Sequence, residues 1–490
     1  MNKKLLFGMV LLLSTVLTCE IFAQAAVKVD PAVYTRRGVS NNMALTNKWL
    51  YSNKLNNYNV AADFVGASGF VRGMAVKNGK MLFIDRNLKK IAVVNGTTGA
   101  KETPVTLAAN IFTYMGRNKA NTADSLWTAG TLTHNDIKVD NAGNVLLGNL
   151  ITSNAGRFQI WKVDITTGVG TLVIDQADMA TLFPSATTMR FDAFGVYGDV
   201  TKSAVILAAN ASATAMEVYK WVITNGVAGT PSLIELDNSL QTGADLAGLA
   251  NLGSAPQVFP LDDNYFYVDG NATFPVLCDK DGNVVDGFKA TLPNSIKDSV
   301  TAPAATPKTI WSMNQGHNGV AEFQVGDKYF LIMAATNTAG TPASTFRLFQ
   351  FADANKAFSG LKCLWTFPQA GMGAASNAYR TAMPCVEVNG TKANIYVYTG
   401  ENGYGMYELD TAAPSGVFNP NSSKVQITVS ENFIRLSEEV ASVEVFNTTG
   451  QKLMSAKNVD VLEAPVTKGV YMVTITDRNG EHKVQKVAIN

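Results

Sequence analysis

A phrase of two short apolar runs around a tight turn recurs six times along the chain and restricts its possible folds to a few. Aligned copies fall at Gly73, His134, Phe191, Gln257, Asn318 and Arg380, with gaps of 61, 57, 66, 61 and 62 residues. Asn-Gly, Asp-Asn or Gly-Asp pairs at the turns favour two-residue β-hairpins. A third and often a fourth apolar run follows each hairpin. The repeat therefore predicts six antiparallel sheets of four strands each.

Repeated four-stranded sheets predict an all-β fold, and the period predicts a six-bladed β-propeller over residues 26–415. Residues 109–131 are among the long loops expected between blades. The sixth repeat lacks a fourth strand, whereas "LTNKWLYSNKL", residues 45–55, resembles the outer strands and precedes the first repeat. We therefore expect residues 45–55 to complete the sixth blade and leave no open sheet edge.

The N-terminal segment has the features of a secretory signal peptide. Lys3 and Lys4 precede an apolar run from Leu5 to Leu17, and Ala23-Gln24-Ala25 has the small-residue pattern of a cleavage site. Residues 1–25 are thus expected to be removed on export. A lipoprotein signal ending at Cys19 fits less well because Leu17 and Thr18 precede the cysteine.

The last 70 residues, 421–490, depart from the repeat. Short alternating strands are joined by Asn-Thr-Thr-Gly, Thr-Lys-Gly and Asp-Arg-Asn-Gly turns. This pattern predicts a small antiparallel β-sandwich of about seven strands, similar to an immunoglobulin domain.

Three stretches of this segment carry a resemblance to a known family: "VASVEVFNTTGQKLMS", "APVTKGVYMVTIT" and the final "HKVQKVAIN". The Gly450-Gln451 pair, the Gly469-Val470-Tyr471 triplet and the basic-apolar ending resemble the type IX secretion sorting domain. The entrance "FNPNSS" departs from the usual proline-asparagine opening of that family. The resemblance implies recognition by the secretion machinery, passage across the outer membrane, and release or attachment at the cell surface.

Polar residues gather where the first strand of each repeat begins. In a propeller these positions face the mouth of the central channel, which brings a few polar groups together. The candidate ligand-binding residues are Arg72, His134, Asn135, Asp136, Arg190, Asp192, Gln257, His317, Asn318 and Arg380, with Trp127 and Trp311 on nearby loops. Two interpretations stay open: the side chains only satisfy backbone groups and hold water, or they bind an anionic ligand.

The sequence favours a binding or scaffold protein that engages a glycan or a protein at the mouth. The alternative is a hydrolase or lyase acting on an anionic saccharide, but Asp136 and Asp192 are the only mouth carboxylates. No catalytic motif, metal site or cofactor site is predicted. Asp279, Asp281 and Asn283 have calcium-loop spacing, yet Gly282 is misplaced and a turn is the better interpretation.

The charge and hydropathy of the chain give no support for nucleic-acid binding or for a membrane span. The net charge of +1 gives no support for a nucleic-acid surface, and no apolar run beyond the signal region is long enough for a transmembrane segment. Cys278, Cys363 and Cys385 have no metal-ligand spacing, and we expect them to be buried free thiols.

Overall fold

The computed structural model describes residues 43–58, 70–117, 123–130, 132–177, 179–186, 189–211, 216–237, 252–270, 273–288, 318–335, 345–368, 371–373, 375, 380–412, 423–430, 433–465, 467–478 and 482–489. Its regular structure is almost entirely β-strand, so the protein is all-β. The segment Leu45–Leu409 belongs to one compact unit and Asp410–Asn490 to a second, and each is described by itself.

The larger unit contains six antiparallel sheets, numbered 1 to 6 by the chain order of their first strands. Sheets 1 to 3 are formed by β2 (Val71–Lys77), β3 (Lys80–Asp85), β4 (Lys90–Asn95) and β5 (Lys101–Thr106); β8 (Asp136–Val139), β9 (Val145–Gly148), β10 (Phe158–Val163) and β11 (Gly170–Gln176); and β12 (Gly195–Gly198), β13 (Ser203–Ala209), β14 (Glu217–Thr224), β15 (Val227–Ala228) and β16 (Ser232–Glu235).

The other three sheets follow the same order of strands. Sheets 4 to 6 are formed by β17 (Gln257–Pro260), β18 (Tyr265–Gly270), β19 (Thr273–Asp279) and β20 (Val284–Gly287); β21 (Val320–Val325), β22 (Lys328–Ala335), β23 (Thr345–Gln350) and β24 (Lys362–Phe367); and β25 (Ala382–Asn389), β26 (Lys392–Thr399), β27 (Gly403–Asp410) and β1 (Ala44–Ser52). Outside these sheets lie the hairpin β6 (Thr113–Arg117) and β7 (Asp124–Thr128), the short helix α2 (Met179–Leu182), and the 3₁₀ turns η1 (Asn53–Leu55) and η3 (Phe358–Gly360).

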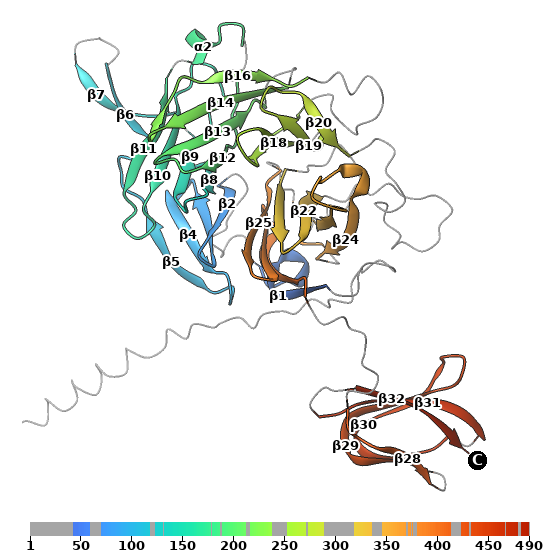
Figure 1. Ribbon diagram of the computed structural model, residues 1–490. Coiled ribbons are helices and arrows are strands. Elements are labelled where there is room, and N and C mark those ends of the chain that lie inside the picture. The colour runs from blue at the N-terminus through green and yellow to red at the C-terminus, as the bar shows by residue number, and fades with distance from the viewer. Residues whose placement is uncertain are drawn as a thin grey trace, which may run out of the picture. The chain divides into compact units, whose positions relative to one another are not determined.

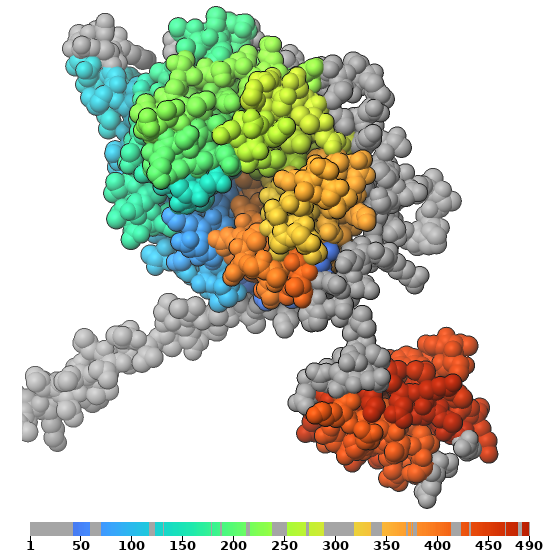
Figure 2. Space-filling view, viewed as in Figure 1, coloured from blue at the N-terminus to red at the C-terminus, as the bar shows by residue number. Residues whose placement is uncertain are grey.

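The sheets succeed one another around the larger unit. Strand β2 lies against β8, β8 against β12, and β12 against β17, while β21 lies against β25 and β25 against β2. In Figure 1 the colour runs around the unit from blue through green and yellow to orange, and blue β1 lies beside the orange strands. Figure 2 shows the same succession in space-filling form. The first and last sheets are therefore neighbours.

Strand β1 joins the two ends of the larger unit. It pairs with β27 as the outer strand of sheet 6, although about 350 residues separate the two strands in the sequence. The fully buried Trp49 of β1 donates its indole N–H to Gly96 O at 2.8 Å, and Gly96 follows β4 in sheet 1. Trp49 also packs with Tyr51 and Tyr404 in one hydrophobic cluster. The N-terminal strand thus contacts both the first and the last sheet.

Three of the contacts between neighbouring sheets depend on glycine. A Cβ atom on Gly73 would lie 2.5 Å from Asp136 Oδ1 of sheet 2. On Gly195 of sheet 3 it would lie 2.2 Å from the carbonyl oxygen of Val258 in sheet 4. On Gly319, directly before β21, it would lie 1.8 Å from the carbonyl oxygen of Ala382 in sheet 6. At these three joints the first strands come closer together than any side chain would allow.

The other three joints are bridged by side chains. Asn135 Nδ2 of sheet 2 donates to Asp192 O beside sheet 3 at 2.6 Å, and Asn318 Nδ2 donates to Ala255 O before sheet 4 at 2.9 Å. Between sheets 6 and 1 the carboxylate of Glu387 accepts from Gly79 N at 3.0 and 3.1 Å. Close glycine contacts of the first strands therefore occur at every second joint around the unit.

The cysteines lie within or beside the sheets as free thiols. Cys278 is in β19 and fully buried, Cys363 is in β24, and Cys385 is in β25 and partly buried. Burial raises the pKa of the Cys278 and Cys385 thiols to about 12. Both thiols are protonated at neutral pH, which makes them poor nucleophiles.

The smaller unit differs from the expected seven short strands. Its described part has five: β28 (Ile427–Ser430), β29 (Phe433–Phe446), β30 (Lys452–Glu463), β31 (Gly469–Thr476) and β32 (His482–Ile489). Strands β29 and β30, with 14 and 12 residues, are longer than the short strands predicted for this segment. Buried Val, Ile and Leu side chains from β28, β29, β31 and β32 form one core, and Gln485 Nε2 donates to Ile427 O across it.

Candidate functional site

The leading end of each sheet, where its first strand begins, carries a connected group of charged side chains in sheets 1 to 3. Arg190 binds Asp192 through two hydrogen bonds, from Nε at 2.6 Å and from Nη2 at 2.7 Å. Arg72 from sheet 1 donates from Nη1 to Asp192 Oδ1 at 3.3 Å. The Asp192 side chain is only 3 % exposed. Two guanidinium groups from different sheets therefore face one buried carboxylate.

Sheet 2 connects these groups. Asn135, which is 1 % exposed, donates to Asp192 O and accepts a hydrogen bond from Arg86 Nη1 at 3.1 Å. Arg86 lies in the turn between β3 and β4, at the leading end of sheet 1. The predicted residues Arg72, Asn135, Arg190 and Asp192 thus lie together. They are held by hydrogen bonds that span three sheets.

Asp136 is saturated by internal partners. Its Oδ1 accepts from Ile137 N at 2.9 Å and from Lys138 Nζ at 2.8 Å, and its Oδ2 accepts from Phe194 N at 3.1 Å. Burial raises the pKa of Asp136, and Lys138 together with the two backbone N–H groups opposes this change. These hydrogen-bond partners all belong to the protein itself, and Asp136 is only 2 % exposed. Asp136 holds sheet 2 against sheet 3 and has no access to a substrate.

His134 is buried and packed, in contrast to the expectation that it faces the channel mouth. Its ring makes an edge contact with Phe112 at 4.8 Å between centroids, and its Nδ1 lies 2.8 Å from Thr133 Oγ1. Its backbone φ of 57° turns the chain sharply before β8. Burial, together with the nearby positive charge of Lys89, lowers the pKa of His134 to about 4. The imidazole is neutral at physiological pH.

The low pKa of His134 predicts a loss of stability in acid. An unfolded histidine with a pKa of 6.5 takes up a proton below that pH, whereas folded His134 does so only near pH 4. The stability is therefore complete above pH 6.5 and is lost progressively as the pH falls to 4. The difference corresponds to about 3 kcal/mol of unfolding free energy.

The His134→Gln variant tests this expectation. Its unfolding free energy, measured in urea at pH 7 and pH 4, should fall by about 3 kcal/mol less than that of the natural protein. Acidic residues contribute equally in both proteins, so the comparison isolates His134. Equal losses in the two proteins would contradict the assignment.

A second polar group lies at the leading ends of sheets 4 and 5. Gln257 begins β17 and is directly opposite Asp269 of β18, and Asn318 precedes β21. Asp269 and Asn318 are fully buried, and Gln257 is 4 % exposed. Burial raises the pKa of Asp269 well above its ordinary value. None of the hydrogen bonds among the described residues joins this group to the arginines of sheets 1 to 3.

The remaining predicted residues lie outside the described part of the chain or have no hydrogen bond, among the described residues, that joins them to either group. Arg380 precedes β25 at the leading end of sheet 6. Arg380 has the same left-handed backbone as His134, with φ 57°, but its side chain is partly exposed. Trp127 lies on β7, where its Nε1 donates to Gly116 O at 3.1 Å within the β6–β7 hairpin. Trp311 and His317 lie outside the residues that the structure describes.

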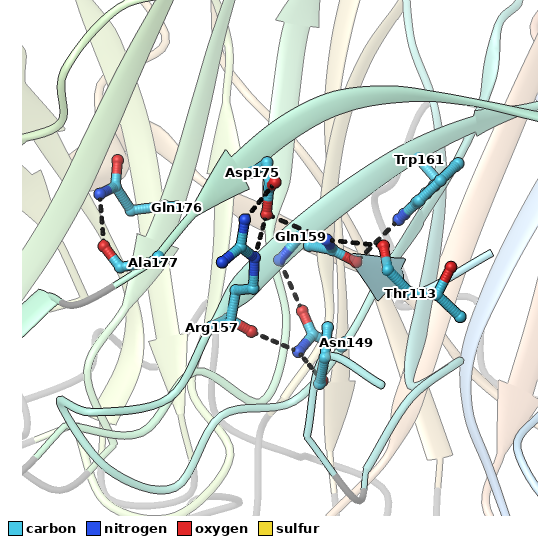
Figure 3. A network of polar contacts seen from close by, with 9 residues as sticks. Thr113, Asn149, Arg157, Gln159, Trp161, Asp175, Gln176 and Ala177 are labelled. Carbon is cyan, nitrogen blue, oxygen red and sulfur yellow. Dashed lines mark hydrogen bonds and ion pairs between the residues drawn. The ribbon is translucent and has the colours of Figure 1, made fainter. Parts of the chain in front are cut away.

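The hairpin that carries Trp127 is fastened to sheet 2 by a network of polar contacts (Figure 3). Arg157 binds Asp175 through two hydrogen bonds, and Gln159 Nε2 donates to Asp175 Oδ1 at 3.0 Å and to Thr113 O at 3.3 Å. Asn149 Nδ2 donates to Ala129 O at 2.9 Å. Residues 109–131, expected to be a loop, thus include a hairpin that is hydrogen-bonded to sheet 2. The Trp127 side chain is held within this hairpin by its bond to the backbone oxygen of Gly116.

Sequence reasoning missed Arg86, Lys89 and Asp269. The signal for Asp269 is present in the repeat, because an Asp or Asn lies at or next to the end of the second strand in four sheets, at Asp85, Asn149, Asn210 and Asp269. Arg86 and Lys89 lie in the turn after Asp85. The register of the β2–β3 hairpin pairs Val71 with Asp85, so the turn after β3 lies beside the start of β2, at the leading end of the sheet.

Two surface cavities lie away from both polar groups. One of about 790 Å³ lies between sheets 3 and 4 and is lined by Lys220, Glu235, Lys280 and Asp281 with apolar neighbours. Another of about 270 Å³ lies between β11 and the β14–β15 turn. Within the described part of the chain, no group of three or more His, Cys, Asp or Glu side chains is placed to hold a metal ion. No helix among these residues is long and apolar enough to span a membrane.

Two segments match family models. Residues 90–257, from the start of β4 to the start of β17, match a domain of unknown function, DUF8500. Residues 418–490 match the secretion system C-terminal sorting domain. A comparison with curated proteins gives no match.

Solved structures with a similar fold include a DUF4623 family protein from Bacteroides eggerthii, with 12 % identity and a TM-score of 0.52 over 79 % of this chain and 77 % of that one. At this identity the likeness concerns the fold alone. The structure of BBS1N in complex with ARL6DN matches with a TM-score of 0.37 and 11 % identity, over 76 % of this chain and all of that one.

The family match at the C-terminus covers the motifs that resemble the type IX sorting domain. It includes the Gly450-Gln451 and Gly469-Val470-Tyr471 landmarks and the final strand β32. Residues 418–490 are a type IX secretion sorting domain, and the protein is exported to the cell surface or secreted.

Proposed function

We propose that the larger unit is a six-bladed β-propeller whose leading end binds an anionic ligand, which makes the protein an exported binding or scaffold protein. The six sheets act as its blades, and β1 closes the sixth. A carboxylated or sulfated glycan is the ligand class that this charge suits best, because guanidinium groups bind such oxyanions through paired hydrogen bonds.

The observation that carries this proposal is the pair of arginines on Asp192. Arg72 and Arg190 bring two guanidinium groups from different sheets to the Asp192 carboxylate. Arg86 and Lys89 add positive charge from the β3–β4 turn, and Lys138 offsets Asp136. Among the described residues at this end, five cationic side chains outnumber three carboxylates: Arg72, Arg86, Lys89, Lys138 and Arg190 against Asp85, Asp136 and Asp192. This excess favours a negative ligand, and salt should weaken the attraction.

The alternative of a hydrolase or lyase finds less support in the geometry. Glycoside hydrolysis uses two carboxyl groups that reach the scissile bond from its two sides. Asp192 is held by two arginines, and Asp136 is held by Lys138 and two backbone N–H groups. Both carboxylates act as structural ligands of other side chains, which favours binding over turnover.

Binding of a heparin-derived hexasaccharide and of an oligogalacturonate, measured by calorimetry at 20 and 200 mM salt, tests the proposal. We expect binding that weakens with salt, and about tenfold weaker binding in the double variant Lys89→Gln, Arg380→Gln. These two side chains make no hydrogen bond or ion pair with another described residue, so the fold should be preserved.

The matched control is Arg435→Gln, Lys457→Gln, which removes two charges from the smaller unit. Equal loss of affinity in the control, or no binding by the natural protein, would contradict the proposed site. Release of new reducing or unsaturated ends from either oligosaccharide would instead support the hydrolase or lyase alternative.

A further inference from the structure

Four buried oxygen atoms at the joint between sheets 4 and 5 have no hydrogen-bond partner among the residues that the structure describes. They are both carboxyl oxygens of Asp269, Oε1 of Gln257 and Oδ1 of Asn318. Asp269 and Asn318 are fully buried, and Gln257 is 4 % exposed. Oxygen atoms that lose water on folding need a replacement partner.

These side chains belong to one neighbourhood. Gln257 and Asp269 are directly opposed on β17 and β18, and such residues point to the same face of a sheet. The backbone N–H groups of Gly270 and of Gly319, next to Asn318, both approach the Asp269 carboxyl group and favour its charged form, although neither makes a hydrogen bond of standard geometry. Asn318 Nδ2 donates to Ala255 O, two residues before Gln257, which turns its amide group towards sheet 4.

The contrast with the other sheets shows that Asp269 is exceptional for its position. Asp85 accepts from Asn87 N and Leu88 N, Asn149 accepts from Gln159 N, and Asn210 accepts from Arg190 N. Each of these oxygen atoms at the end of a second strand is used to fix a loop or a neighbouring strand. Within the described part of the chain, the Asp269 oxygens accept no hydrogen bond of this kind.

We propose that Asp269, Gln257 and Asn318 bind a hard cation of the Ca²⁺ class. One carboxylate and two amide oxygens are the ligand types that Ca²⁺ prefers, and its flexible coordination of 6–8 oxygens accepts backbone carbonyls and water as the rest. A proton on Asp269 would supply one donor and satisfy one of the other oxygens. A cation satisfies all four. With a single carboxylate, the affinity belongs to the weak, extracellular class of about 10⁻⁴–10⁻³ M.

This site is independent of the arginine group and differs from the calcium-like loop of the same sheet. Asp279 of that loop already accepts hydrogen bonds from Asn283 N, Asn283 Nδ2 and Asp281 N, so its oxygens are used. Asp281 is exposed and paired with Lys280. The loop therefore lacks the unsatisfied oxygens that distinguish Asp269.

Thermal unfolding of the exported chain, first treated with EDTA and then titrated with Ca²⁺, Mg²⁺ or Na⁺ at constant ionic strength, tests the proposal. We expect 10 mM Ca²⁺ to raise the Tm by about 2–4 °C, with a smaller effect of the other two cations. Asp269→Asn keeps the shape and removes the charge, and it should abolish the shift. Asp281→Asn, the matched control, should retain it.

Equilibrium dialysis with ⁴⁵Ca²⁺ measures the number of binding sites and their affinity directly, so its result does not depend on how stable the Asp269→Asn variant is. We expect one site in the natural protein and about tenfold weaker binding in Gln257→Met, which keeps the length of the side chain and removes its oxygen. The proposal is overturned if the natural protein shows neither a shift nor a site. It is also overturned if Asp269→Asn retains the shift, or becomes more stable than the natural protein without any dependence on Ca²⁺, as a protonated Asp269 would require.

Discussion

Replacing Trp49 with alanine is expected to lower the free energy of unfolding of the larger unit by about 3–5 kcal/mol. The side chain is fully buried, donates to Gly96 O, and packs against Tyr51 and Tyr404. Its loss leaves a cavity exactly where the first and last sheets meet and an acceptor without its donor. Urea unfolding followed by far-ultraviolet circular dichroism measures the change.

Trp127→Ala is the matched control, because it removes the same side chain from the partly exposed β6–β7 hairpin. We expect its effect to stay within about 1 kcal/mol. If the two alanine variants lose equal stability, Trp49 does not join the ends of the larger unit. Deletion of residues 44–52 should be more severe still, because it exposes the edge of β27.

Gly319→Ala is expected to cost about 3 kcal/mol, measured in the same way. Its Cβ atom would lie 1.8 Å from Ala382 O and 2.8 Å from Pro384 Cδ. Both atoms belong to β25, and a backbone oxygen cannot rotate away as a flexible side chain can. The first strands of sheets 5 and 6 would have to separate, which disturbs the packing on both sides of the joint.

Gly229→Ala provides the comparison for Gly319. Its added Cβ atom would meet only Val222 O, at 3.4 Å, and its φ does not lie in the left-handed region. We expect this variant to be unchanged or slightly more stable, because alanine restricts the unfolded chain. Equal stability of the two variants would show that β21 and β25 do not approach so closely.

Local chemistry explains why the strands were predictable. The Asn78-Gly79 turn between β2 and β3 has left-handed φ values of 51° and 69°, as a tight hairpin of this sequence requires. The hairpin β6–β7 was not predictable from its own residues, because its attachment comes from Gln159 and Asn149 of sheet 2. The length of β29 was likewise not predictable from its own residues, because β28, β30 and β31 pair with different parts of it.

The candidate site was predictable in position but not in the direction of its side chains. Register along the repeat identifies Arg72, Arg190 and Asp192, which the structure joins by hydrogen bonds. The same register includes His134, but its ring packs on Phe112. A repeat specifies the backbone position of a residue, whereas the neighbouring loop decides whether its side chain faces solvent or core.

The alternation of joints has a consequence for how such chains can be recombined. Gly73, Gly195 and Gly319 follow one another at 122 and 124 residues, twice the single-sheet period. An exchange of one such segment between related proteins would carry a complete glycine contact with it, because both partners of that contact lie inside the segment. New contacts would have to form only at the joints between exchanged segments, where the first strands make no close glycine contact. Side chains at such joints adapt more readily than backbones that lie directly against each other. A pair of sheets is therefore the segment that keeps its first-strand glycine contact when it is exchanged.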